Sequence, residues 1–368
     1  MTDSNNVDVV IIGAGPSGIL MSHLLGRRGI SHVVLERETA GWNWLTLWDG
    51  FRMNTLNWMN RLPGSPEFAP RQDRNAMALK RDAVRWFEDY LKSVRPPLHE
   101  HTEVTHVAPS IAGWQVVTSE GNWSARAVVI CTGISRDAIV PKMAETLPSS
   151  VCQLTSRQYK NPAQIETSNV LVVGSGASGS QICWDLCKDK KRFAQIYLAG
   201  SDVKILPHHV LGIPTLNIME KIGMLTVSRD SFLGSRMYKK FLSHERGQPT
   251  PSPGPKQLAA EYGVTVVGRV ESVQGAKLYT TGEAVPTDDL TIVWATGCRT
   301  DYSFIDLPDG LETNGQPRHH RGAAENAPGL FFLGLKFQHA ANSHTLMGIG
   351  PDGEYLAEQI AIHVGQRN

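Results

Sequence analysis

The sequence predicts an α/β fold with two domains, each built on a parallel sheet, and three observations support this prediction. Residues 7–25 (VDVVIIGAGPSGILMSHLL) and 169–186 (NVLVVGSGASGSQICWDL) each have the pattern of a buried strand, a glycine-rich loop and a helix. A second strand-like run follows each of them, at 32–37 and 195–200, and completes a strand–helix–strand unit. The length of 368 residues also exceeds the size at which a single hydrophobic core usually stops growing.

The first unit continues into a helix, a group of antiparallel strands and a linker. Its own helix is expected at residues 16–29, and residues 80–94 (KRDAVRWFEDYLKSV) have the apolar period of a second helix. Residues 103–133 alternate as antiparallel strands do, with a turn at Gly121-Asn122, and end in a buried strand. Residues 138–168 combine scattered prolines with polar residues and no clear period, so we expect a linker there.

The second half of the chain predicts a second unit and then a return to the first. The runs that predict its elements are a helix at 178–189, short helical pieces at 205–255 with a proline- and glycine-rich loop at 247–256, and strands at 264–273 and 290–297. Residues 329–364 read as strand, loop and final helix. We therefore expect one domain from residues 1–155 plus 300–368, into which a second domain, residues 165–299, is inserted.

Composition narrows the classes of partner. Lys plus Arg number 36 and Asp plus Glu 35, for a net charge of +1, and there is no basic tract, so a nucleic-acid partner is not expected. The first residues, MTDSNN, are polar and the longest apolar stretches have the length of strands, which predicts a soluble, cytoplasmic protein without a membrane partner. The five cysteines form no CxxC pair and no zinc-like spacing, so neither a dithiol mechanism nor a metal site is expected.

The first glycine loop has the spacing of a dinucleotide-binding site. Gly13 permits the tight turn, Gly15 allows the backbone to approach a pyrophosphate, and Gly18 lets the helix pack on the strand. The helix N-terminus then faces the phosphates with unsatisfied N–H groups. Glu36 ends the next strand, where a carboxylate can accept from a ribose hydroxyl. The structural alternative is a tight strand–helix connection that needs glycine for packing alone.

The second glycine loop repeats this spacing with Gly174, Gly176 and Gly179. Two adenine-dinucleotide sites in one chain suggest a bound redox cofactor and a diffusible reductant, usually a flavin and a nicotinamide. The run after the second strand, YLAGSDVK, has neither a Glu to favour NADH nor an Arg to hold the NADPH 2′-phosphate. Ser201 or Lys204 could substitute, so the choice between NADPH and NADH stays open.

Several further motifs occur in a fixed order along the chain. They are GAGPSG, GWNWLTLWDGFRMNTLNWMNRLPG, VVICTG, LTSRQYKNP, GSGASG, WATGCRTDYSF and PGLFFLGLKFQH with GIGPDGEYLAEQI. With this set the chain resembles the class B flavoprotein monooxygenases, specifically the short bacterial members of the flavin-containing monooxygenase family. The resemblance covers nearly the whole length. It implies a glutathione-reductase-like two-domain flavoprotein with two Rossmann-like dinucleotide-binding domains, in which the NAD(P)H domain is inserted in the FAD domain.

The resemblance also implies an activity. FAD is reduced by NADPH (or NADH), reacts with O₂, and delivers one oxygen atom to a small organic substrate through a C4a-(hydro)peroxyflavin. The reaction would be a biosynthetic tailoring step, by hydroxylation, N- or S-oxygenation, or Baeyer–Villiger insertion. The alternative is a flavin oxidoreductase that does not oxygenate, either a dehydrogenase or an NAD(P)H oxidase. The substrate, and whether the protein is a monomer or a homodimer, stay open.

The cofactor contacts implied by the resemblance fall into two groups. For FAD they are Gly13, Gly15, Pro16, Ser17, Gly18 and Glu36, with Arg37 along the adenine, Trp44 beside the flavin, Val104 offering backbone groups to the adenine, Thr132 and Gly133 at a strand end, and Asp352 at the start of the last helix facing the flavin pyrimidine or ribityl chain. For the nicotinamide nucleotide they are Gly174, Gly176, Ser178, Gly179, Lys204, Thr296 and Gly297.

Two residues are candidates for the chemistry. Asn54, in FRMNT, matches an Asn near the flavin whose amide can donate to the distal peroxide oxygen or orient the nicotinamide; a turn-forming Asn is the alternative. Gln338, His339 and His344 precede the terminal helix on the expected substrate side, where one of them could move a proton. His339 is the catalytic candidate among them, although a structural role is equally open.

Three departures from the family pattern stand out, and the first is the missing arginine for the 2′-phosphate described above. Trp42 replaces a glycine in the flavin-side loop, which implies a differently shaped loop or a narrower substrate space. In the interdomain fingerprint Tyr159 matches, but Thr155 replaces the His, Val151 the Gly and Ser149 the Phe. That His is linked in the family to nicotinamide positioning. We therefore expect the handling of the reductant to differ from that of the family.

Overall fold

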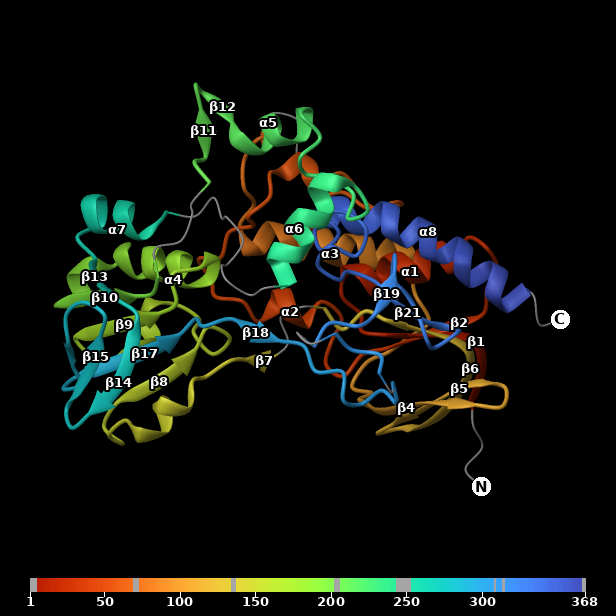
Figure 1. Cartoon of the computed structure of the whole chain (residues 1–368), viewed down its shortest axis with the longest axis horizontal. Coiled ribbons are helices and arrows are strands. Elements are labelled where there is room, and N and C mark those ends of the chain that lie inside the picture. Colours follow the sequence, from red (N-terminus) through yellow and green to blue (C-terminus); the bar gives the residue numbers. More distant parts are fainter. Residues whose placement is uncertain are drawn as a thin grey trace.

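The computed structural model describes residues 5–68, 73–133, 137–201, 206–242, 253–307, 309–312 and 315–365. Within these ranges two sheets, one with a parallel core and one fully parallel, form the two ends of the molecule, and helices cover them (Figure 1). Each sheet contains one of the glycine-loop units. The two-sheet α/β prediction is confirmed.

The first sheet has nine strands, with the main order β19-β20-β21-β6-β1-β2-β3. Its strands are β1 (Asn5–Ile12), β2 (His32–Leu35), β3 (Leu98–His99), β4 (Val104–Ser110), β5 (Gly113–Thr118), β6 (Gly121–Ile130), β19 (His319–His320), β20 (Ala323–Ala324) and β21 (Leu330–Phe332). The strands β21, β6, β1, β2 and β3 are parallel, and β4 and β5 extend β6 in antiparallel fashion. Because β21 pairs with β6, the chain returns near its end to the sheet that contains β1.

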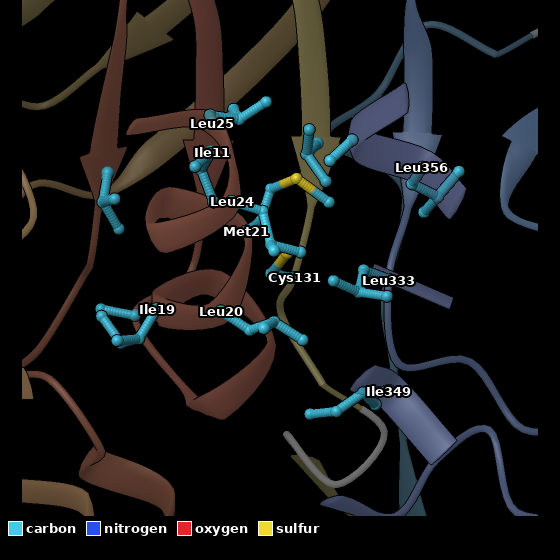
Figure 2. Close-up of a cluster of buried hydrophobic side chains, with 14 of the residues drawn as sticks. Ile11, Ile19, Leu20, Met21, Leu24, Leu25, Cys131, Leu333, Ile349 and Leu356 are labelled. Carbon is cyan, nitrogen blue, oxygen red and sulfur yellow. The ribbon is translucent and has the colours of Figure 1, made fainter. Parts of the chain in front are cut away.

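Both faces of β1 are buried, as its continuous apolar run predicts. Val9 and Ile11 face helices α1 (Pro16–Gly26), α3 (Lys80–Val94) and α8 (Leu346–Gly365), and the intervening Val10 and Ile12 face the opposite core, which contains residues of β4, β5 and β6. Figure 2 shows the first of these cores, where side chains of α1 lie between Ile11 and the α8 residues Ile349 and Leu356. Because α1 packs on β1 in this core, the N-terminus of α1 lies at the carboxyl end of β1.

The second sheet is fully parallel, with the order β13-β10-β9-β17-β8. Its strands are β8 (Cys152–Thr155), β9 (Asn169–Val173), β10 (Gln195–Ala199), β13 (Thr265–Gly268) and β17 (Leu290–Trp294). Helices α4 (Ala177–Cys187) and α7 (Pro255–Tyr262) pack on one face. The other face is covered by the three-stranded sheet β14 (Val270–Gln274), β15 (Lys277–Thr280) and β16 (Val285–Pro286), and by the 3₁₀-helix η3 (Lys142–Thr146).

Two short antiparallel strands connect the two sheets. β7 (Asp137–Ala138) leads toward the second sheet and β18 (Cys298–Arg299) returns from it, and Ala138 pairs with Cys298 (Figure 1). The division into an FAD domain (1–155 plus 300–368) and an NAD(P)H domain (165–299) stays a prediction. However, β8 pairs with β17 and so belongs to the second sheet, which moves Cys152–Thr155 out of the first predicted domain.

The remaining elements are short. They are α2 (Trp42–Leu45), α5 (Thr215–Lys221), α6 (Phe232–Leu242), the hairpin β11 (His209–Val210) and β12 (Ile213–Pro214), and the 3₁₀-helices η1 (Asn57–Met59), η4 (Pro162–Gln164) and η5 (Lys190–Arg192). None of the helices in these described ranges combines the length and apolar character needed to cross a bilayer. All five cysteines have free thiols.

Candidate functional site

The three glycines of the first loop lie in different surroundings, so each position requires glycine for a different reason. Gly13 has a φ of +103°, and a Cβ there would lie 2.6 Å from the carbonyl oxygen of Cys131. A Cβ on Gly18 would overlap the carbonyl oxygen of Gly13. Gly15, which caps the N-terminus of α1, has no neighbouring atom within 4 Å of that position. The outer glycines are therefore required for packing, whereas Gly15 borders open space.

The second glycine loop has the same division. Gly174 has a φ of +118° and a Cβ there would overlap the carbonyl oxygen of Ala295, and a Cβ on Gly179 would overlap that of Gly174. Gly176 caps α4 and has no atom within 4 Å. Packing alone would account for two glycines in each loop. The middle glycine, Gly15 in the first loop and Gly176 in the second, borders open space. A glycine at this position lets a ligand approach the backbone closely.

The first loop opens into a cavity of about 1000 Å³ at the carboxyl ends of the first sheet's strands. This is the edge at which open α/β sheets bind their ligands. The predicted FAD contacts that line it are Gly13, Gly15, Pro16, Ser17, Glu36, Arg37, Trp44, Val104, Thr132 and Gly133. The structure therefore brings together ten residues that lie as far as 120 positions apart in the chain. Gly18 lies beneath the loop and packs α1 against it.

Glu36 fastens the end of β2 to the glycine loop. Its Oε2 accepts from the backbone N–H of Ala14 at 2.8 Å, and its Oε1 accepts from that of Glu38 at 2.9 Å. Each carboxylate oxygen has a further lone pair, so Glu36 can accept from a ribose hydroxyl while it holds the loop. Beside it, Arg37 lies 3.7 Å from the Glu103 carboxylate, next to Val104 at the start of β4.

Aromatic rings form the wall of the cavity after β2. Trp44 lies 6.1 Å from Trp86 and 5.9 Å from Phe87, measured between ring centroids. Gly41 precedes α2 with a φ of +75°, and a Cβ there would lie 2.5 Å from the Phe87 ring. Trp42 also lines the cavity and keeps 42% of its surface exposed. The tryptophan that departs from the family pattern thus borders the same space as Trp44.

The wall of the cavity also includes two cations that the sequence did not single out. Arg157 donates from Nη2 to the Thr46 hydroxyl at 3.1 Å, and Lys160 donates from Nζ to the carbonyl oxygens of Thr46 and Arg157. Burial lowers the pKa of both side chains. Their position flanking Tyr159 in the fingerprint segment was the available signal. Thr155 lines the cavity as well, and the Tyr159 hydroxyl donates to Asp185 Oδ2 at 3.1 Å.

Asn54 lies outside the cavity-lining set, in the loop before η1. Its Oδ1 accepts from Gln181 Nε2 at 2.9 Å. Gln181 belongs to α4, so this contact links the first glycine-loop unit to the second. No local pattern around Asn54 or Gln181 predicts this link.

His339 and Asp352 lie near each other through Ser343. The Ser343 hydroxyl oxygen accepts from the backbone N–H of His339 at 3.0 Å and hydrogen-bonds the Asp352 carboxylate. Burial raises the pKa of Asp352 to about 6 and lowers that of His339. Within the described ranges, His339 Nδ1 and Asp352 Oδ2 are buried and have no hydrogen-bond partner.

One expectation for this region requires correction. Asp352 was expected at the start of the last helix, but α8 begins at Leu346, because Thr345 and Asn342 already form its first turn. Asp352 is 3% exposed in the second turn and is absent from the cavity-lining set. Gln338 accepts from the backbone N–H groups of Gly334 and Leu335, so its side chain holds the loop.

The remaining residues predicted for the nicotinamide nucleotide surround the second loop. Ser178 is exposed in the first turn of α4. Thr296 donates through its hydroxyl to the Ile139 carbonyl oxygen, and Gly297 accepts from the Ile139 N–H at 2.9 Å, which ties this turn to the crossing at β7. Lys204 lies outside the described residues. None of the described members of this group lines the first cavity.

Comparison with known proteins agrees with this geometry. A family model described as pyridine nucleotide-disulphide oxidoreductase matches residues 10–206. The uncharacterized oxidoreductase CzcO-like of Geobacillus kaustophilus is 32% identical over 97% of this chain and 99% of its own. The indole-3-pyruvate monooxygenase YUCCA1 of Oryza sativa is 25% identical over 83% of this chain and 77% of its own.

Solved structures share the whole fold. The flavin-containing monooxygenase from Stenotrophomonas maltophilia superposes with a TM-score of 0.75 at 23% identity, covering 98% of this chain and 99% of that one. The complex of OTEMO with FAD and NADP superposes with a TM-score of 0.71 at 16% identity, over 99% and 87% of the two chains. The two-domain flavoprotein fold and the resemblance to flavin-dependent monooxygenases are confirmed. With a family model that matches more than half of its length, the chain belongs to the pyridine nucleotide-disulphide oxidoreductase family.

Proposed function

We propose that this protein is a monooxygenase that uses FAD and NADPH or NADH to insert one oxygen atom of O₂ into a small organic substrate. The observation that carries the proposal is the pair of loops in which only the middle glycine borders open space, one of them opening into a cavity of about 1000 Å³. Monooxygenases among the relatives and neighbours support the same reaction class.

FAD would extend through the cavity from Glu36 to Trp44. The pyrophosphate would meet Gly13, Gly15, Pro16, Ser17 and Gly18 at the N-terminus of α1, where N–H groups and the helix dipole favour negative charge. Glu36 would accept from the ribose, with Arg37 and Val104 beside the adenine. Trp44, Thr132 and Gly133 would contact the part of FAD nearer the flavin ring, and Asp352 would approach it from α8.

The nicotinamide nucleotide would bind at the second loop. Its contacts would be Gly174, Gly176, Ser178 and Gly179 at the start of α4, with Thr296 and Gly297 on the facing turn and Lys204 as the candidate for a 2′-phosphate. Bound FAD would supply the electron transfer from this nucleotide to O₂.

The chain's own residues would orient groups and move a proton. Gln181 holds Asn54 by its Oδ1, so the donor Nδ2 is the part of the amide that can serve the reacting oxygen or the nicotinamide. Burial lowers the pKa of His339, which keeps its imidazole neutral at pH 7 and able to accept a proton. Trp42 and Trp44 would exclude water from this end of the cavity.

Isotope labelling tests the proposal. The enzyme reconstituted with FAD would be reduced anaerobically by NADPH or NADH and mixed with ¹⁸O₂ and panels of ketones, amines and sulfides. We expect one ¹⁸O atom in a product, detected by mass spectrometry. Recovery of every reducing equivalent as H₂O₂, with all compounds unchanged, would contradict oxygenation.

The second candidate is a flavin oxidoreductase that does not oxygenate. Thr155 stands where the family fingerprint has His, and its hydroxyl donates to Gln158 Oε1 at 3.0 Å, so it offers no imidazole to the cavity. Bacillithiol disulfide reductase from Bacillus cereus shares the fold with a TM-score of 0.69 at 16% identity. The release of H₂O₂ in the labelling experiment would favour this second candidate.

A further inference from the structure

A loop of the first unit lies against the helix of the second unit. Trp48, in the segment between α2 and α3, belongs to the same buried cluster as Ile182 and Leu186 of α4. The Asp49 N–H donates to the Lys160 carbonyl oxygen at 2.7 Å. A Cβ on Gly50 would overlap the Asp185 carboxylate of α4. The backbone that leads to Asn54 is therefore packed closely on α4.

Gln181 is the hydrogen-bonding centre of this contact. It is 5% exposed, and its Oε1 accepts from the Arg52 N–H at 3.0 Å while its Nε2 donates to the Arg52 carbonyl oxygen at 3.0 Å. The same Nε2 donates to Asn54 Oδ1 at 2.9 Å. One side-chain amide thus binds both backbone groups of one residue and the side chain of another, two positions later.

The two contacts with Arg52 determine the chemistry of the third. A backbone N–H can only donate and a carbonyl oxygen can only accept, so the Gln181 amide has a single orientation that satisfies both groups of Arg52. In that orientation Gln181 presents N–H to Asn54. Asn54 must then turn its oxygen toward Gln181, and its Nδ2 donor lies on the other side of the amide.

We propose that Gln181 is a positioning residue that fixes the orientation of the Asn54 amide. The inference rests on the proposed function, in which Asn54 donates to the reacting oxygen or the nicotinamide. Asn54 and Gln181 come from different glycine-loop units. Gln181 also follows Gly176, the N-cap of α4, by five residues, so the helix that would bind the reductant's pyrophosphate holds Asn54 as well.

The test uses the FAD-bound enzyme without any substrate. Enzyme reduced anaerobically with one equivalent of NADPH is mixed with O₂, and the rates of flavin reduction and of H₂O₂ release are recorded for wild type, N54A, Q181M and N54A/Q181M. We expect N54A and Q181M each to change the H₂O₂ release rate or the reduction rate by about tenfold, the loss associated with one hydrogen bond at a reacting group. The double variant should match N54A, because Gln181 acts through Asn54.

Q181E separates orientation from mere loss of packing. Its carboxylate keeps the shape and accepts from Arg52, but it cannot donate to Asn54 Oδ1 until it is protonated, and burial raises the pKa of such a carboxyl. We expect the defect of Q181E to diminish as the pH falls from about 8 to about 6, whereas that of Q181M should not. Q153E is the control for the charge alone, since Gln153 makes the same two kinds of contact, with Trp294 and the Ala144 carbonyl oxygen, but is exposed in the second sheet.

The outcomes are distinct. If N54A behaves as wild type, the proposed role of Asn54 fails. If N54A is impaired but folded Q181M and Q181E behave as wild type, or if the double variant shows the sum of both defects, the positioning role of Gln181 is wrong. Thermal unfolding and FAD content are measured for each variant, and Q181E supplies the answer should Q181M not fold.

Discussion

The open and packed glycines of the first loop can be separated by single methyl groups. Gly15 has an extended φ of −80° and nothing within 4 Å of a Cβ, so Gly15→Ala should leave the unfolding free energy of the apoprotein within about 1 kcal/mol. Its methyl group would enter the space proposed for the pyrophosphate, and we expect FAD affinity to fall at least about tenfold. Gly18→Ala forces its methyl into the carbonyl of Gly13 and should destabilise the apoprotein itself by about 1–3 kcal/mol or more.

Calorimetry of the apoproteins and FAD titration measure the two effects. Gly176→Ala is the matched control, because that position is equally open but belongs to the second loop. The Gly176→Ala variant should retain its FAD affinity and lose affinity only for the nicotinamide nucleotide. Equal FAD affinity of wild type and Gly15→Ala would contradict the proposal that FAD binds at this loop.

The ionised form of Asp352 destabilises the folded protein, so its contribution to stability depends on pH. Burial raises its pKa to about 6, above the ordinary value of about 4. The folded state therefore binds the extra proton between these values, and its unfolding free energy falls by up to about 3 kcal/mol as the pH rises from about 4 to about 6. Asp352→Asn removes this titration, so the variant should gain stability relative to wild type across that window.

Denaturant titrations at several pH values check this difference. His319 and His344, whose pKa values burial lowers to about 3 and about 4, change stability in the opposite direction. They are present in both proteins and cancel in the comparison. A constant gap between wild type and Asp352→Asn from pH 4 to 7 would show that Asp352 is not buried in this way.

At the residue scale, the sequence could predict what is local in the chain. The glycine spacing and the acid at the end of β2 follow from one strand–helix–strand unit, and ten of the predicted residues line one cavity. Gln181 could not be found in this way, because its role arises from a contact with Asn54 more than 100 positions away. The hydrophobic period of a helix predicts which of its faces is buried, but it does not predict which residue a buried Gln will hydrogen-bond.

Among the elements, the short helix α2 borders the cavity with Trp42, Asn43 and Trp44. Trp42 begins it, lines the cavity and is 42% exposed. Trp42→Ala should therefore change the unfolding free energy by no more than about 1 kcal/mol. It should widen the space beside Trp44, so we expect NADPH oxidation to be stimulated by bulkier ketones, amines and sulfides that wild type does not accept.

The same compound panel, assayed with both proteins, measures this effect. Leu45→Ala is a suitable control, since Leu45 is also exposed in α2 but is not among the residues that line the cavity. An unchanged specificity in Trp42→Ala with intact FAD binding would mean that Trp42 does not restrict the substrate space.

Element boundaries were predictable where one local pattern decides them. The amphipathic run at 80–94 gave the bounds of α3, whereas the helix expected at 16–29 ends at Gly26, because the chain turns there and Gly29 has a φ of +68°. The linker expected at 138–168 contains the edge strand β8, whose first two residues are exposed and whose last two are half-buried, so its sequence has no strand-like alternation. Among the described strands, β8 pairs with β17 only. Short edge strands depend on their neighbour, which the chain supplies about 140 residues later.

Across the whole molecule, the two sheets are joined by more than the crossing strands. Trp48 comes from the first unit, is 2% exposed, and lies in the core of the second with Tyr159 and Ile182. Its indole Nε1 has no hydrogen-bond partner within the described part of the chain. The ring therefore contributes through packing, with an edge-on contact to Phe51 at 5.2 Å between centroids. A single aromatic side chain thus couples the stability of one sheet to the other.

Removing this ring should loosen the second sheet more than the first. We expect Trp48→Ala to destabilise the protein by about 3–5 kcal/mol and to raise amide exchange in β9 and β10 well above that in β1 and β6, as measured by hydrogen–deuterium exchange. Trp48→Phe keeps an aromatic ring and discards the unpaired N–H, so it should cost less than about 2 kcal/mol. Equal acceleration of exchange in all four strands would mean that the chain unfolds as one unit, which would also count against the proposed division into two domains.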